Sequence, residues 1–205
     1  MSPLRFALFA TAIGECALAW NDVGLVGVWL PESRSGDLRR KLERRFPRGA
    51  GAAPDGAIVD AIAAIRQLLD GVPVDLRAIA LDWSVVPEPA RRVYELTREV
   101  GPGRVVTYGA IARALGGDVD ARSVGQALGA NPFTIVVPCH RVIAAHGRLG
   151  GFSAPGGAAQ KQRLLAIEQA RPDGPPGLFD DPCGELNPPA ASATAATPTR
   201  PLPAR

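Results

Sequence analysis

The sequence contains few of the residue types on which disulfide scaffolds and metal sites depend. Its 205 residues include three cysteines and two histidines, and aromatic residues make up only 5%. The three cysteines, Cys16, Cys139 and Cys183, are odd in number and far apart, which excludes a paired disulfide framework and favours a reducing, cytoplasmic compartment. No metal site is expected, because these cysteines and the two histidines, His140 and His146, follow no recognised ligand spacing.

Long hydrophobic runs are also missing. No segment approaches the roughly 20 apolar residues of a membrane-spanning helix, so no membrane partner is expected. The short apolar run in "MSPLRFALFATAIGEC" resembles a signal peptide only faintly, because it contains Glu15 and lacks a small-residue cleavage site. The net charge of +3 is mildly basic and permits a nucleic-acid partner without requiring one.

Residues 1–85 predict a small α/β unit without a chemical constellation. "CALAW", "NDVG" and "LVGVWL" are typical of a β-hairpin. "SGDLRRKLERRF", with polar residues at its start, predicts a first helix, and "DGAIVDAIAAIRQLLDG" a second that stops at Gly71. "VDLRAIALDW" predicts a further strand. We expect this unit to pack against and support the rest of the chain.

Residues 86–170 predict short helices separated by glycine. "EPARRVYELTREV" is typical of a helix, and Thr107 and Asp120 are N-cap candidates for two more. Those two helices, joined at Gly116–Gly117, match a helix-turn-helix in outline. A last helix is predicted at "QKQRLLAIEQA". Residues 171–205 hold nine of the 20 prolines and predict a disordered Pro/Ala-rich tail.

The second helix of this pair is nearly bare of long side chains. A helix that reads the major groove normally offers several polar side chains to base edges, whereas Arg122 stands alone here. A small-residue helix suits close backbone approach to a minor groove with one inserted arginine. Tight packing in an ordinary core is the alternative, and glycine and alanine alone favour it. The small residues are Ala121, Ser123, Gly125, Ala127, Gly129 and Ala130.

The run "IVVPCHRVIAAHGRLGGFSAPGG" places Cys139 beside His140, after Pro138, which fixes the backbone. A working thiol needs a base or a lowered pKa, and side chains adjacent in extended backbone point apart. A water-mediated relay is therefore expected, with Glu168 behind the histidine and a thiol pKa below about 8.5. A buried, unreactive cysteine and a cysteine hydrolase remain open alternatives from the residues alone.

Several ordered motifs resemble one family. "VVTYGAIA", "ARSVGQALGANP", "GANPFTIV", "PCHRVI", "GFSAPGG" and "LLAIE" are together similar to the O6-alkylguanine-DNA alkyltransferases, also called methylated-DNA–protein-cysteine methyltransferases. The resemblance covers roughly residues 88–170. It implies an α/β (α+β) fold, with a ribonuclease-H-like first domain and a mainly helical, winged-helix-like second domain that carries the helix-turn-helix.

The resemblance implies a DNA-repair methyltransferase that acts once and needs no cofactor. Cys139 takes the alkyl group from O6-alkylguanine, with O4-alkylthymine as a further candidate lesion. His140, backed by Glu168, draws off the thiol proton through water. Tyr108 assists the flipped base as it leaves. Arg122 fills the gap in the duplex, which is bound through its minor groove by a monomer.

Further roles follow from the same resemblance. Asn131 braces the turn that leads to an active-site strand, and Arg141 is structural. The pocket for guanine is formed around Pro138, Val142, Phe152 and Ser153, and Phe152 stands where relatives frequently carry tyrosine. The DNA-contacting residues are Tyr108, Ala121, Arg122, Ser123, Gly125 and Ala130.

Two other functions remain as alternatives. One is a non-catalytic, alkyltransferase-like protein that binds DNA lesions; such proteins resemble the same domain with another residue at the cysteine position, so Cys139 argues against it. The other is a transcription factor, which the lack of base-reading side chains disfavours.

Overall fold

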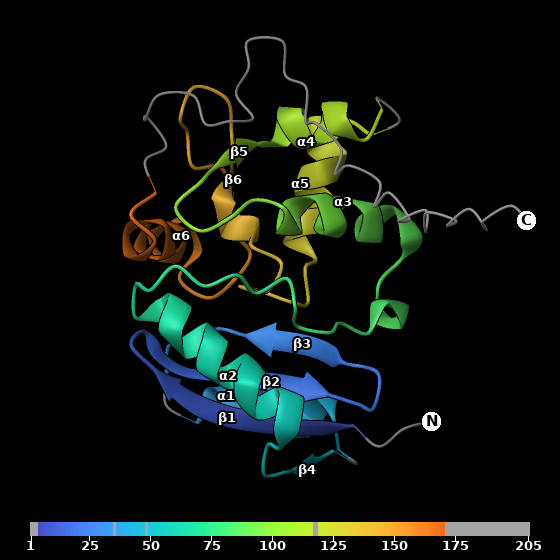
Figure 1. Ribbon diagram of the computed structural model, residues 1–205, viewed down its shortest axis with the longest axis vertical. Helices are drawn as coiled ribbons and strands as arrows, with labels where there is room; N and C mark the ends of the chain where they lie inside the picture. Colours follow the sequence, from blue (N-terminus) through green and yellow to red (C-terminus); the bar gives the residue numbers. More distant parts are fainter. Residues whose placement is uncertain (1–3, 35, 48, 117–118, 171–205) are drawn as a thin grey trace, which may run out of the picture.

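The computed structural model describes residues 4–170, apart from residues 35, 48 and 117–118. For residues 50–51 it describes the backbone alone. The tail at 171–205, with Cys183, and Gly117 of the expected turn lie outside these described residues. A sheet with two helices forms one part of the molecule, and a group of further helices lies against it (Figure 1).

The sheet has the strand order β3-β2-β1-β4. Strands β1 (Arg5–Thr11), β2 (Gly14–Trp20) and β3 (Leu25–Trp29) are antiparallel neighbours, while the short β4 (Ala50–Gly51) runs parallel to β1. The hairpin predicted from "CALAW" and "LVGVWL" is therefore confirmed. The apolar run that faintly resembles a signal peptide is strand β1, paired along its whole length with β2.

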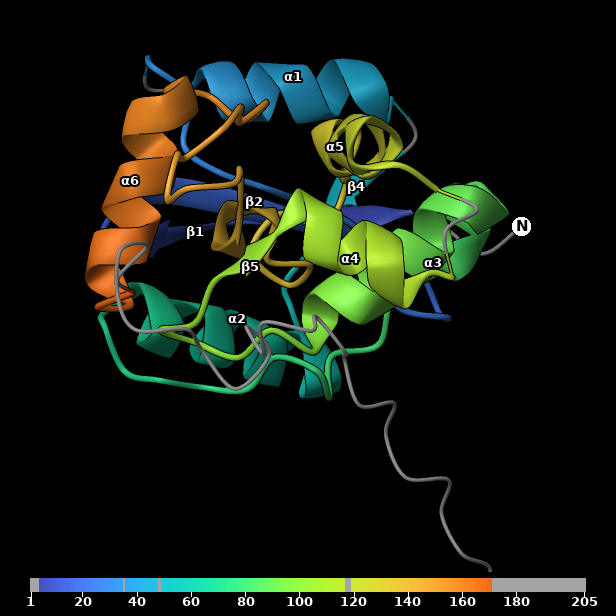
Figure 2. The same cartoon turned by 90° about the horizontal axis from the view of Figure 1, so that it is seen from above.

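Both faces of the sheet are covered by a helix. Alternate residues of β2 point to opposite sides, so that Ala17 and Ala19 join one apolar cluster while Leu18 and Trp20 join another. Helix α1 (Asp37–Arg45) contributes to the first cluster and α2 (Gly56–Leu69) to the second. Figure 2 shows these helices on opposite sides of the strands.

Both helices of this part were predicted, but the residue that precedes the first turn of α1 differs from the prediction. Helix α1 begins after Gly36, which is left-handed (φ 79°) and offers no side-chain cap, in place of the polar caps expected from the sequence. Helix α2 stops as predicted, because Gly71 has φ 87°, a conformation that glycine adopts without steric cost.

The prediction of a strand at "VDLRAIALDW" is wrong. Only Leu81 of this segment makes a bridge, to Leu25; residues 77–79 form a turn and the others before it are irregular. Their backbone acceptors are used elsewhere: the Arg98 guanidinium donates hydrogen bonds to the carbonyl oxygens of Leu76, Arg77 and Ile79 at 2.8–3.3 Å. The apolar pattern of this segment reflects its burial and not a strand ladder.

The remaining elements form the helical part. It contains η1 (Trp83–Val85), α3 (Glu88–Arg98), β5 (Val106–Thr107), α4 (Tyr108–Ala114), α5 (Ala121–Gly129), η2 (Cys139–Arg141), β6 (Val142–Ile143) and α6 (Gly157–Ile167). The predicted caps are confirmed: Thr107 accepts a hydrogen bond from the Ala110 amide and Asp120 from the Ser123 amide. None of the helices in the described ranges is long and apolar enough to cross a membrane.

The two parts share one core. The amide of Val28 donates to the Pro132 carbonyl at 2.8 Å, which joins β3 to the loop that leads to Cys139. Arg163 on α6 donates to the carbonyl oxygens of Ala12 and Ile13 in the first hairpin. The sheet therefore supports both the loop before the cysteine and the helix after it.

Candidate active site

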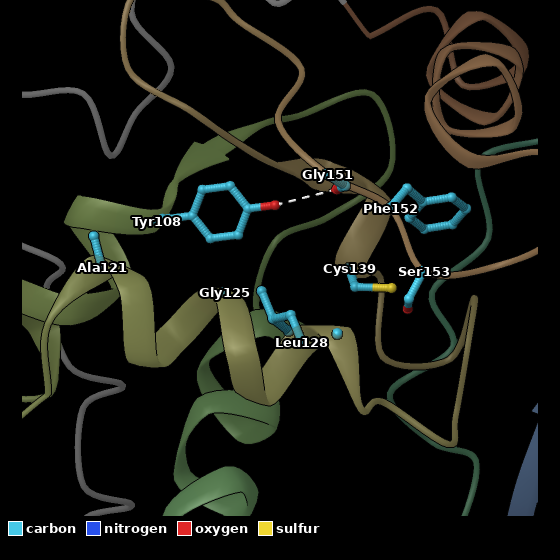
Figure 3. A pocket seen from close by; sticks show the side chains of 9 residues that line it. Tyr108, Ala121, Gly125, Leu128, Cys139, Gly151, Phe152 and Ser153 are labelled. Atoms are coloured by element: carbon cyan, nitrogen blue, oxygen red, sulfur yellow. Dashed lines mark hydrogen bonds between the residues drawn. The ribbon is translucent and has the colours of Figure 1, made fainter.

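A cavity of about 460 Å³ opens between helices α4 and α5, the η2 turn and the loop after β6. Figure 3 shows Tyr108 on one side of it and the Cys139 sulfur on the other, with Phe152 and Ser153 on the loop. The lining residues are Tyr108, Ala121, Gly125, Leu128, Gly129, Cys139, Gly151, Phe152 and Ser153. Elements distant in sequence thus meet around one cysteine.

Glycines hold the Tyr108 ring between two stretches of backbone. A Cβ at Gly150, which has φ 68°, would lie 3.1 Å from the Tyr108 ring, and one at Gly125 would lie 3.8 Å from it. The Tyr108 hydroxyl donates to the Gly151 carbonyl at 3.4 Å (Figure 3). The tyrosine therefore enters the pocket at a fixed angle.

Helix α5 presents its small residues outward as well as to this pocket. Val124 and Leu128 are its buried residues, whereas Ala121, Arg122 and Ser123 are exposed at its start. Ala130, the C-cap, is exposed too. A glycine and alanine helix buried in an ordinary core, which was the alternative, is therefore wrong for this face. The one charged side chain of this helix is Arg122, which is exposed.

Cys139 lies in a turn and not in the expected active-site strand. Residues Cys139–Arg141 form a 3-10 helix, and the strand begins only at Val142. Adjacent side chains in such a turn do not alternate across a plane. The expectation that the Cys139 and His140 side chains point apart, which assumed extended backbone, therefore does not apply. Cys139 is buried, with 6% of its surface exposed.

The expected lowering of the thiol pKa is contradicted. Burial raises the pKa of Cys139 above its ordinary value, because the low-dielectric pocket disfavours the thiolate. The Asn131 side chain, the positive charge of Lys161 and the amides of Cys139 and His140 oppose this effect without overcoming it. The cysteine is therefore a protonated thiol that needs a base at the moment of reaction.

His140 is placed to be that base. Its side chain is fully buried, and its Nε2 lies 2.9 Å from Oε1 of Glu168. Burial lowers the pKa of His140, while the hydrogen bond and charge of Glu168 oppose the fall. A neutral histidine beside an ionised carboxylate must use Nε2–H as the donor, since the carboxylate can only accept. Nδ1 then carries the free lone pair, and no described residue partners this buried atom.

Glu168, the C-cap of α6, is held by four donors. Burial would raise its pKa, but hydrogen bonds from His140 and Arg141 lower it to about 2. Arg141 donates to both carboxylate oxygens at 2.8 Å, and the Gly103 amide donates at 3.4 Å. Arg141 also donates to the Val100 carbonyl. The carboxylate is thereby fixed in its charged form behind the histidine.

Asn131 bridges the loop between α5 and the cysteine. Its Nδ2 donates to the Val137 carbonyl and its Oδ1 accepts from the Phe133 amide, both at 2.9 Å. Inside this loop Ile135 has φ 80°, a strained conformation for a β-branched residue. The amide side chain thus holds in place the segment that delivers Cys139.

Two residues expected at the pocket, Pro138 and Val142, are not among its lining residues. Pro138 and Arg141 border a smaller hollow on the other side of the loop, next to Arg98. Val142 is fully buried, and its carbonyl accepts a hydrogen bond from Lys161 at 2.6 Å. Phe152 and Ser153 do line the cavity.

Lys161 is a site residue that was not expected from the sequence. It is fully buried beside Leu164 and Leu165, and its ammonium contacts the Tyr108 hydroxyl at 3.5 Å. Helical spacing could have revealed it, because positions 161, 164, 165 and 168 share one face.

The other reactive side chains of the described residues lie elsewhere. Cys16 is buried in β2, and burial raises the pKa of its thiol to about 11. His146 lies in the loop after β6 and has φ 59°. Within the described ranges no three histidine, cysteine, aspartate or glutamate side chains gather as metal ligands would.

Comparison with known proteins agrees with this geometry. Residues 88–170 match the family model described as "6-O-methylguanine DNA methyltransferase, DNA binding domain". A methylated-DNA–protein-cysteine methyltransferase from Methanothermobacter thermautotrophicus is 38% identical over 154 residues, which are 75% of this chain and 79% of the relative. A protein from Thermus thermophilus named "DNA base-flipping protein" is 40% identical over 74% of this chain and 99% of its own length.

Solved structures give the same result. A crystal structure of Mycobacterium tuberculosis OGT in complex with DNA has a TM-score of 0.62 at 27% identity, covering 80% of this chain and 92% of the other. The fold is thus the mixed α/β architecture of these methyltransferase structures. The chain belongs to the methylated-DNA–protein-cysteine methyltransferase family.

Proposed function

We propose that this protein repairs DNA by moving a methyl or other alkyl group from O6 of guanine irreversibly onto the sulfur of Cys139. The observation that carries the proposal is the position of this sulfur: it lines the cavity opposite Tyr108, and the adjacent His140 is backed by a charged carboxylate. Relatives are named methylated-DNA–protein-cysteine methyltransferases. O4-alkylthymine is a second candidate substrate.

The chemistry follows from the protonation states of the site. His140 Nδ1 takes the Cys139 proton through a water, and Glu168 stabilises the imidazolium that forms. The sulfur then displaces guanine from the alkyl carbon, and Tyr108 assists the departing base. Burial raises the pKa of Tyr108, which keeps its hydroxyl able to donate a proton. The thioether product has no easy leaving group, so each molecule acts once and no cofactor takes part.

The same proposal assigns the supporting residues. Asn131 positions the loop of Cys139, and its contacts with Val137 and Phe133 support that role. Arg141 is structural, supported by its bonds to Glu168. The guanine pocket is formed by Phe152 and Ser153, with the backbone around Pro138 and Val142 closing it from behind.

The DNA is bound as a duplex through its minor groove, with the alkylated base flipped into the cavity. The base has to leave the stack because the sulfur is buried. The exposed small residues of α5 suit close approach to the groove, and Arg122 fills the gap in the duplex. Tyr108, Ala121, Ser123, Gly125 and Ala130 make the remaining contacts. Affinity falls with added salt as phosphate contacts release counterions.

The proposal extends to the domains. Residues 1–85 form a ribonuclease-H-like domain, supported by the strand order β3-β2-β1-β4. Residues 86–170 form a winged-helix-like domain, supported by the packing of α4 on α5 and by the β5–β6 pair. Residues 171–205 are a tail dispensable for transfer. The protein acts as a cytoplasmic monomer.

A second candidate is a non-catalytic protein that binds DNA lesions, favoured by the relative named "DNA base-flipping protein". Cys139 separates the two. Purified protein is incubated with excess duplex that carries O6-methylguanine, and restored guanine is counted against protein molecules. One guanine per protein, with no second turnover, supports repair. Binding of the duplex without any restored guanine would instead support the non-catalytic protein that binds DNA lesions.

A further inference from the structure

The least expected group at the active site is the buried Lys161. It lies on α6 on the same face as Leu164 and Leu165, where an apolar side chain would cost less. Its ammonium donates to the carbonyl oxygens of Val142 at 2.6 Å and Gly151 at 3.3 Å. Buried charges are normally paired, yet none of the described carboxylates forms an ion pair with this ammonium. Burying an ammonium without an ion-pair partner is unfavourable, so its presence beside the active site indicates a role in the reaction.

Tyr108 is the partner that gives this charge a function. The Lys161 Nζ lies 3.5 Å from the Tyr108 hydroxyl and 5.6 Å from the centre of its ring. The same hydroxyl reaches the Gly151 carbonyl that Lys161 also contacts. Tyrosine, lysine and the pocket loop therefore form one hydrogen-bonded group at the cavity (Figure 3 shows the Tyr108–Gly151 bond).

We propose that Lys161 is a positioning residue that acts through Tyr108: it orients the hydroxyl and resupplies the proton that guanine takes as it leaves. This inference rests on the proposed function. A lysine that only tied the loop to β6 would affect transfer equally with and without the Tyr108 hydroxyl.

The step balances in protons and charge. The thiol proton passes to His140, the sulfur–carbon bond forms, and the bond from carbon to guanine O6 breaks with its electron pair left on the base. Guanine takes the Tyr108 phenolic proton, and the tyrosine oxygen takes one from the Lys161 ammonium. One positive charge, on Lys161 before and on His140 after, is present throughout.

The titration of Lys161 supports this arrangement. Burial lowers its pKa to about 8, and a charged Cys139 opposes the fall. The titratable groups that face it are Tyr108 from α4 and Cys139 and His140 from η2. Because only the ammonium can resupply a proton, transfer should slow as the pH rises through about 8. Tyr108 itself titrates above its ordinary range and does not produce this fall.

The test is a double-mutant cycle on the full chain, with single-turnover repair of duplex O6-methylguanine as the measurement. Lys161→Met should slow transfer by at least 10-fold with Tyr108 present and by less than 2-fold in Tyr108→Phe. Lys161→Arg keeps the charge and should retain more activity than Lys161→Met, without the fall in rate near pH 8. Gln162→Met, an exposed neighbour on α6, is the matched control and should be neutral.

Two results would overturn the inference. One is an equal fold-loss from Lys161→Met in both Tyr108 backgrounds, and the other is an unchanged alkaline fall in Lys161→Arg. If Lys161→Met does not fold, the arginine variant alone decides through its pH profile. Absence of transfer by the wild-type chain would instead contradict the proposed function, so the two failures are distinguishable.

Discussion

His140 and Glu168 form a pair closed off from solvent: Nε2 lies 2.9 Å from Oε1, and the side chains are 0% and 3% exposed. Glu168 is fixed as a carboxylate by Arg141 as well, so the histidine is oriented with its other nitrogen free. This pair, and not a lowered thiol pKa, is the structural basis for activating Cys139.

Removing either member of the pair should slow alkyl transfer to different extents. His140→Ala is expected to lower the single-turnover rate by about 100-fold or more, because the thiol loses its base. Glu168→Gln should lower it by roughly 10-fold, because the histidine keeps a partner but loses the stabilising charge. DNA affinity should not change in either variant. Equal rates for the three proteins at all pH values would rule out the relay.

Glu168 should also contribute to stability in acid. Its pKa in the folded protein is about 2, below the ordinary 4.5, so its contribution is fully present above pH 4.5 and is lost as the pH falls toward 2. Denaturant unfolding of wild type and Glu168→Gln should therefore differ most near neutral pH, by about 3 kcal/mol, and converge in acid. A constant difference over this pH range would show that the carboxylate charge makes no such contribution.

The Cys139 thiol should titrate above its ordinary range in the free protein. Burial is the cause, and Asn131 partly opposes it, so Asn131→Ala should raise the thiol pKa further. The measurement is the ultraviolet absorbance of the thiolate against pH, with Cys139→Ser subtracted to remove the other thiols. A titration near neutral pH would mean that the site stabilises the thiolate before substrate arrives.

Arg122→Ala should separate base extrusion from chemistry. Its side chain is exposed at the start of α5, away from the relay, so repair of duplex should slow by about 10-fold or more while reaction with free O6-alkylguanine is unchanged. Arg44→Ala, an exposed arginine on α1, is the matched control for lost positive charge. Equal losses on duplex and free base would contradict the wedge role.

Local features were predictable from the sequence. The caps at Thr107 and Asp120 depend on bonds to residues three positions on, and the apolar face of α2 depends on helical spacing, so neighbouring residues sufficed. The site motifs were also recognisable, because each is a short run of consecutive residues, such as "PCHRVI" and "GFSAPGG".

Features set by distant partners were not predictable. The Arg98 guanidinium donates hydrogen bonds to the carbonyl oxygens of Leu76, Arg77 and Ile79, about 20 positions earlier in the chain, and these carbonyls form no strand ladder. The direction in which the Cys139 pKa shifts follows from burial by several elements, and the role of Lys161 follows from a strand and a loop that meet it only in the fold. Helical spacing could have placed Lys161 on the buried face of α6, but it does not reveal the partners that Lys161 contacts.

The central claim is that Cys139 is the alkyl acceptor, and peptide mapping by mass spectrometry tests it most directly. After incubation with duplex O6-methylguanine, the peptide that contains Cys139 should gain the mass of one methyl group, while those with Cys16 and Cys183 stay unmodified. Cys139→Ala should bind the duplex and gain nothing. A methyl group on either other cysteine, or methylation that persists in Cys139→Ala, would contradict the account.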